Sequence, residues 1–139
     1  MRSFCEKGAM NHLLIVAAGG AVGASLRHLT GLAAMRLLGI GFPWGTMTVN
    51  LVGSFIMGVF VEWLARRAGA TPELRLFAAT GLLGGFTTFS AFSLDVAVLW
   101  ERGEGLLAAS YVLVSVCGAI AALFAGLYLV RHFRLRRCF

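Results

Sequence analysis

Long apolar stretches separated by short polar connectors make up most of this chain. A helix needs roughly 20 residues to cross a hydrocarbon layer about 30 Å thick, and four stretches are long enough: about 12–38, 45–64, 74–100 and 106–130. Pro43, Pro72 and the charged segment 101–105 fall between these stretches, as turn-forming residues do at a membrane interface. The pattern therefore predicts an all-α membrane protein, with four transmembrane helices in a single transmembrane domain over residues 1–139.

The composition also indicates lipid as the surroundings of the chain. Hydrophobic residues make up 59% of the sequence and charged residues only 13%, whereas a soluble domain carries about 25% charged residues. The mean hydropathy is +0.85. Trp44, Trp63 and Trp100 all fall near the ends of predicted spans, where aromatic side chains favour the headgroup region. We therefore expect membrane lipid to surround the helices.

The net charge of +6 does not indicate a nucleic-acid partner, because most basic residues lie in short clusters that flank the apolar stretches. Four spans place the N-terminus, the connector 65–73 and the C-terminus on one side. That side carries nine basic residues, namely Arg2, Lys7, Arg66, Arg67, Arg75, Arg131, Arg134, Arg136 and Arg137. The other side carries only Arg36 and Arg102. This bias predicts a single orientation with both termini in the cytoplasm.

Polar side chains inside the apolar spans are informative because they are costly in hydrocarbon. Arg27 interrupts the first span and Asn50 the second, while Tyr111 and Ser115 share one face of the fourth. No carboxylate lies in the middle of any span. Hydrogen-bond donors without carboxylates favour a small anion as the transported species. The same side chains could also serve only to link helices.

Two glycines and a row of hydroxyls, residues 84–90, disturb the third span near its middle. Glycine adds backbone freedom, and hydroxyls compete for backbone hydrogen bonds. A kinked but continuous helix fits these residues, as does a broken helix whose freed carbonyls could hold a cation; we predict an interruption near residues 84–88. The spacings Gly19/Gly23 and Gly81/Gly85 allow close helix packing, either within one chain or between chains.

Three segments together resemble the Fluc/CrcB fluoride channels. They are Gly20-Ala21-Val22-Gly23-Ala24-x-x-Arg27, Gly45-Thr46-x-x-Val49-Asn50-x-x-Gly53-Ser54-Phe55-x-x-Gly58 and Thr80-Gly81-x-x-Gly84-Gly85-Phe86-Thr87-Thr88-Phe89-Ser90-x-Phe92-Ser93. The resemblance covers three helices in order, and the third segment is the most specific. It implies an antiparallel, dual-topology homodimer with two anion pores in a bacterial inner membrane. Such a channel exports fluoride passively down its gradient and protects the cell from fluoride toxicity. A chain of four helices is too small to enclose a pathway alone, so an oligomer is expected on size as well.

The resemblance also implies a fluoride pathway. The ring edges of Phe89 and Phe92 would coordinate the ion, Asn50 would donate an amide hydrogen bond, and Arg27 would supply positive potential at the vestibule. The polar track would continue through Thr88, Ser90, Tyr111 and Ser115. No catalytic residue is implied, and we expect no enzymatic activity.

A structural sodium ion at the dimer interface is the one cofactor that the resemblance implies. The main-chain carbonyls of Gly84 and Thr87 would bind it. Two positions depart from the family pattern: Ala91 stands where Thr is frequent, which removes one hydroxyl, and Asp95 stands where Glu is common, which shortens the reach of the carboxylate.

Two other classes of protein remain as alternatives. A small multidrug-type exporter also has four helices and often dual topology, but it relies on a carboxylate in the first helix, where this chain carries Arg27. A membrane assembly factor without transport activity would explain the glycine spacings, but not Asn50 or the block of residues 84–92. The single orientation that the charges predict also conflicts with an antiparallel dimer.

Overall fold

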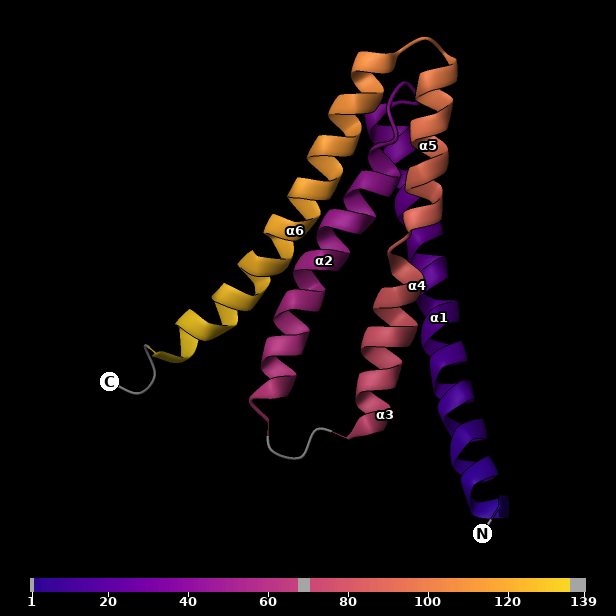
Figure 1. Ribbon diagram of the computed structural model, residues 1–139, viewed down its shortest axis with the longest axis vertical. Coiled ribbons are helices and arrows are strands. Elements are labelled where there is room, and N and C mark those ends of the chain that lie inside the picture. The colour runs from indigo at the N-terminus through magenta and orange to yellow at the C-terminus, as the bar shows by residue number, and fades with distance from the viewer. Residues whose placement is uncertain (1, 68–70, 136–139) are drawn as a thin grey trace.

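The computed structural model describes residues 2–67 and 71–135, which form four long helical rods (Figure 1). The first two rods are α1 (Arg2–Leu38) and α2 (Trp44–Ala65). The third consists of α3 (Pro72–Arg75), η1 (Leu76–Leu83), α4 (Gly84–Phe86) and α5 (Phe89–Glu101), and the fourth is α6 (Gly105–Leu135). In this described part, the spans Ala9–Leu38, Trp44–Ala65, Pro72–Glu101 and Gly105–Phe133 are long and apolar enough to cross a membrane. The prediction of four transmembrane helices is confirmed.

The helices run beyond the apolar stretches that identified them. The first begins well before residue 12, and α6 continues past residue 130. The start of α1, the end of α2, the start of α3 and the end of α6 lie at one end of the molecule (Figure 1). Of the nine basic residues assigned to this end, the side chains of Arg2, Lys7, Arg134, Arg136 and Arg137 lie outside the described part of the structure.

At this end, a carboxylate joins α2 to α6. Glu62 is only 7% exposed. Its Oε1 accepts a hydrogen bond from Arg66 Nε at 2.6 Å, and its Oε2 accepts one from Arg131 Nε at 2.9 Å. This carboxylate is therefore buried and paired, as a charge with little exposure to solvent requires.

α1 packs against η1 and α4 through glycines on both sides. A methyl group at Gly81 would lie 2.9 Å from the carbonyl oxygen of Val16, and one at Gly85 would lie 2.8 Å from that of Gly20. A methyl group at Gly19 would lie 2.5 Å from the carbonyl oxygen of Phe77. The backbones therefore touch along this seam. The sequence allowed these glycines to pack helices either within one chain or between chains. In the structure they pack helices of the same chain.

The third rod is interrupted at Thr87 and Thr88. Both residues are extended, with φ/ψ of −81°/156° and −153°/125°, between the end of α4 and the start of α5. Gly53 of α2 lies opposite the interruption and leaves the room that the Thr87 methyl group and the Phe86 ring occupy. The predicted interruption is confirmed, and a kinked but continuous helix is excluded.

Candidate functional site

Asn50 supplies the hydrogen bonds that the interruption removes from the backbone. Its Nδ2 donates to the carbonyl oxygen of Thr88 at 3.0 Å, and the N–H of Thr88 donates to Asn50 Oδ1 at 2.8 Å. At bilayer depth, an unpaired backbone group costs several kcal/mol. One side chain of α2 therefore satisfies both polar groups of an extended residue. This role was not predicted from the sequence. The two bonds to Thr88 use only one of the two Nδ2 hydrogens.

Two backbone donors near the interruption are diverted from their helical acceptors. In a continuous α-helix, the N–H groups of Thr88 and Ala91 would donate to the carbonyls of Gly84 and Thr87. Here Thr88 N donates to Asn50 Oδ1, and Ala91 N donates to Thr88 Oγ1 at 3.2 Å. The carbonyls of Gly84 and Thr87 therefore lack the helical partners they would otherwise have.

A groove of about 370 Å³ lies beside the interruption, between α2, α5 and α6. We call it the helix-break groove; its walls include Asn50, Thr87, Thr88, Phe89, Phe92 and Ser115. The Phe89 and Phe92 rings have centroids 5.5 Å apart at 44°, and Phe89 is 76% exposed whereas Phe92 is 7% exposed. Ser115 Oγ is buried and has no hydrogen-bond partner among the described residues. An amide hydrogen, hydroxyls and ring edges therefore gather in one place, and all of them can face a small anion.

Other predicted pathway residues lie next to the groove rather than in its wall. Ser90 Oγ is 3.2 Å from Thr88 Oγ1. Tyr111 is fully buried, packs on Phe92 with a centroid distance of 5.3 Å, and donates from its hydroxyl to Asp95 Oδ2 at 3.2 Å. The shorter carboxylate of Asp95 thus reaches Tyr111.

Arg27 lies in a separate cavity of about 330 Å³, between α1, the start of α2 and the start of α5. His28, Thr46 and Thr88 also line this cavity, and Thr88 lines the helix-break groove as well. Arg27 and the ring pair therefore line two different cavities, which share Thr88. Gly84, although exposed, does not line the groove.

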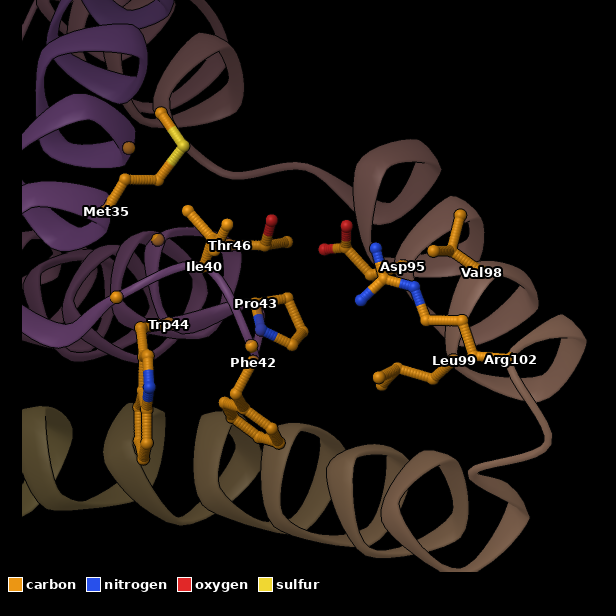
Figure 2. A pocket seen from close by; sticks show the side chains of 14 residues that line it. Met35, Ile40, Phe42, Pro43, Trp44, Thr46, Asp95, Val98, Leu99 and Arg102 are labelled. Carbon is orange, nitrogen blue, oxygen red and sulfur yellow. The ribbon is translucent and has the colours of Figure 1, made fainter.

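A third cavity, of about 250 Å³, lies under the connector between α1 and α2 (Figure 2). Thr46 of α2 and Asp95 of α5 face each other across it, while the Phe42 and Trp44 rings are directed toward α6. Thr46 also lines the cavity that contains Arg27. Polar walls therefore continue from this end of the molecule to the interruption. No role for Phe42 or Thr46 in this arrangement is predicted from the sequence.

Comparison with known proteins gives the family. The family model described as CrcB-like protein, Camphor Resistance (CrcB), matches residues 14–127, which include parts of all four rods. Fluoride-specific ion channels FluC of Chelativorans sp. and Mesorhizobium japonicum are each 62% identical over 122 residues, which cover 88% of this chain and 98% of the relative. The protein of the same name from Agrobacterium fabrum is 55% identical over 123 residues, with the same coverage. With its interrupted third rod and the polar groove beside it, this chain therefore belongs to the CrcB family.

Proposed function

We propose that this protein is a passive, fluoride-specific ion channel in a bacterial membrane, through which fluoride leaves the cell down its gradient. Membership of the CrcB family and the shared name of its relatives support this function. The observation that carries the residue assignment is the buried hydroxyl of Ser115 in the helix-break groove, which makes no hydrogen bond of standard geometry among the described residues. A buried donor without a partner costs free energy, which an ion in the groove would offset. Conduction breaks no covalent bond, so no catalytic residue is assigned.

In this proposal, the groove replaces the hydration shell of fluoride with fixed donors, as selectivity filters do with their own ions. Ser115 donates its hydroxyl hydrogen, and Asn50 donates the Nδ2 hydrogen that Thr88 does not use. Phe89 and Phe92 present ring edges, which carry positive partial charge. Ser90, Thr88 and Tyr111 extend the polar track, and Arg27 raises the potential in the cavity that shares Thr88 with the groove.

The pathway is completed in the proposal by a second, antiparallel copy of the chain. Phe89 is 76% exposed at the interruption, and Ser90 and Gly84 are exposed beside it. Polar groups in hydrocarbon need a protein partner or a water-filled cavity. A two-fold axis in the membrane plane would bring the two interruptions together and give two pores in one homodimer. The bias of basic residues toward the terminal end opposes this arrangement, which makes topology a direct test.

A sodium ion at the centre of that dimer would satisfy the carbonyls of Gly84 and Thr87. Their diverted helical donors, described above, support this assignment. Small hard cations prefer oxygen ligands, and two protomers would supply two carbonyls each. The ion would therefore have a structural role at the interface and would not move along the fluoride pathway.

Ion flux from liposomes that contain the purified protein tests the function. We expect fluoride efflux without a proton gradient, together with a far slower chloride efflux, measured by ion-selective electrodes against protein-free liposomes. Proton-driven transport of an organic cation without fluoride efflux would favour the multidrug-type exporter. The absence of any flux from a correctly folded oligomer would favour an assembly factor. Either of the last two results would overturn the proposal.

A further inference from the structure

Five aromatic rings form a continuous row from the α1–α2 connector to the interruption in the third rod. The order is Trp44, Phe42, Tyr111, Phe92 and Phe89, and we call this set the aromatic row. The successive centroid distances are 4.5, 5.4, 5.3 and 5.5 Å. All four lie in the range in which aromatic pairs attract each other in offset or edge-on geometry.

Phe42 is the one member of the aromatic row that lies outside the helices. Its connector is held at both sides: Gly39 adopts a φ of +86° and donates to the carbonyl of Met35, while Trp44 N donates to the carbonyl of Phe42 at 2.8 Å. The Phe42 ring is half-buried and meets the Tyr111 ring at 87°. Figure 2 shows this ring directed toward α6. The hydrogen-bonded α1–α2 connector therefore places the Phe42 ring against the core.

Tyr111 is the ring through which Phe42 reaches the groove. The Tyr111 side chain is 0% exposed, and its contacts include one carboxylate and two aromatic rings. Its hydroxyl is bound to Asp95, one neighbour of its ring is Phe92, and another is Phe42. The first two partners both belong to α5, whereas Phe42 belongs to the α1–α2 connector, so Phe42 is the ring that ties Tyr111 to that connector.

We infer that Phe42 is a positioning residue for the fluoride pathway, which it influences by holding Tyr111 and thereby the orientation of Phe92. The inference rests on the proposed function of the Phe89 and Phe92 ring pair. The edge of an aromatic ring is positive and its face is negative. A ring that turns toward an anion with its face therefore repels it, and the angle of Phe92 decides whether fluoride is favoured. No contact between Phe42 and the ion is required.

Replacing Phe42 with leucine tests the inference, because leucine keeps apolar bulk but removes the ring. We expect the initial rate of fluoride efflux from liposomes to fall about tenfold, in line with the strength of one aromatic pair, and Phe42→Tyr to restore it. Phe60→Leu is the matched control, because Phe60 is also half-buried on an aromatic partner, Trp63, but lies outside the aromatic row. Its efflux should equal that of the parent. Phe42→Met replaces Phe42→Leu if the leucine variant does not form the parent oligomer.

The rate at which Tyr111 is nitrated shows directly whether Phe42 holds the Tyr111 side chain in place. The chain has two tyrosines, and Tyr128 is exposed, so a Tyr128→Phe background isolates Tyr111. Tetranitromethane should nitrate Tyr111 several-fold faster in Phe42→Leu than in the parent or in Phe60→Leu. Parent-like efflux in Phe42→Leu, or slow efflux with unchanged nitration, would overturn the inference. A Phe92→Ile variant, measured in parallel, distinguishes a failure of this inference from a failure of the proposed function. If Phe92→Ile conducts like the parent, the assignment of the Phe89 and Phe92 ring pair to the pathway is itself wrong.

Discussion

At the scale of single residues, one amide side chain decides whether the backbone of the third rod can be extended inside the membrane. Both polar atoms of the Asn50 amide are bonded to Thr88. An asparagine in an apolar span indicated a functional residue, and the expected role was donation to an anion. The backbone tie could not be read from the sequence because it joins positions 38 residues apart in two different rods.

Replacing Asn50 with aspartate should therefore damage both the fold and the pathway. The new carboxylate cannot donate to the Thr88 carbonyl, and a buried unsatisfied acceptor costs about 1–3 kcal/mol. It also places negative charge beside the anion route, so fluoride efflux should fall at least about tenfold, or ~1.4 kcal/mol in the barrier. Thermal unfolding in detergent and liposome efflux measure the two effects. Asn11→Asp, at an exposed position, makes the same chemical change and should alter neither. Parent-like efflux in Asn50→Asp would remove this residue from the pathway.

The ring pair provides the second test at this scale. Phe89→Ile and Phe92→Ile keep apolar bulk but lose the positive ring edge, so each should lower fluoride efflux about tenfold while the oligomer persists. Size-exclusion chromatography checks assembly and ion-selective electrodes measure efflux. Phe124, exposed on α6 and outside the helix-break groove, provides the control Phe124→Ile. Equal efflux in all three variants and the parent would mean that the rings only fill space.

At the scale of elements, the interruption could be predicted but its surroundings could not. Two glycines followed by hydroxyls marked residues 84–88, and Thr87 and Thr88 are indeed extended. The π-helical winding of Leu76–Leu83, which packs against α1, has no comparable signal in the sequence. The Asp95–Tyr111 pair was detectable in part, since both residues lie a similar distance from the turn between α5 and α6, which places them at the same height.

The seam between α1 and η1 predicts opposite outcomes for two adjacent glycines. A methyl group at Gly19 would collide with backbone atoms of η1, whereas one at Gly20 would meet nothing within 4 Å. Gly19→Ala should therefore destabilise the fold by about 1–3 kcal/mol, as overpacking does. Gly20→Ala should be neutral or stabilising by up to about 1 kcal/mol, because alanine favours helix. Thermal unfolding of the two variants side by side decides the matter. Equal losses would mean that Gly20 also lies in a tight contact, in the assembled protein.

The proposed sodium site lies in the third rod, at Gly84 of α4 and at Thr87 just beyond it. Thr87→Ser leaves both carbonyls in place, so stabilisation by sodium should persist. Gly84→Ala favours regular helix by about 1 kcal/mol and should weaken that stabilisation. The measurement is the difference in unfolding temperature between sodium and a large organic cation at equal ionic strength. If the parent protein unfolds at the same temperature in both salts, the carbonyls of Gly84 and Thr87 hold no structural sodium.

At the scale of the whole molecule, two features of the chain predict different orientations in the membrane. Nine basic residues assigned to the terminal end and two to the other predict one orientation. Exposed polar groups at the interruption instead favour an antiparallel partner. Part of the positive charge is already compensated, since Glu62 pairs with Arg66 and Arg131. Acidic residues contribute little to orientation, however, so these ion pairs leave the bias of basic residues in force.

A single cysteine at Gly41, an exposed position in the α1–α2 connector, tests the orientation in cells. In a background with the native cysteines replaced by serine, a membrane-impermeant maleimide should label half of the protein in intact cells and the remainder after lysis. Complete labelling of intact cells would mean that every chain has its termini inside, and the antiparallel dimer would be wrong.

The tie between Asn50 and Thr88 also bears on how the protein is made. A ribosome produces α2 before it produces the third rod, so the amide is already in the bilayer when the extended residues arrive. The backbone of Thr88 therefore has its hydrogen-bond partner waiting at the moment of insertion. If the chain were circularly permuted so that α2 came last, the newly inserted third rod would have to stay regular or leave its peptide groups unpaired until synthesis ended. The order of the helices along the chain thus suits biogenesis as well as the finished fold.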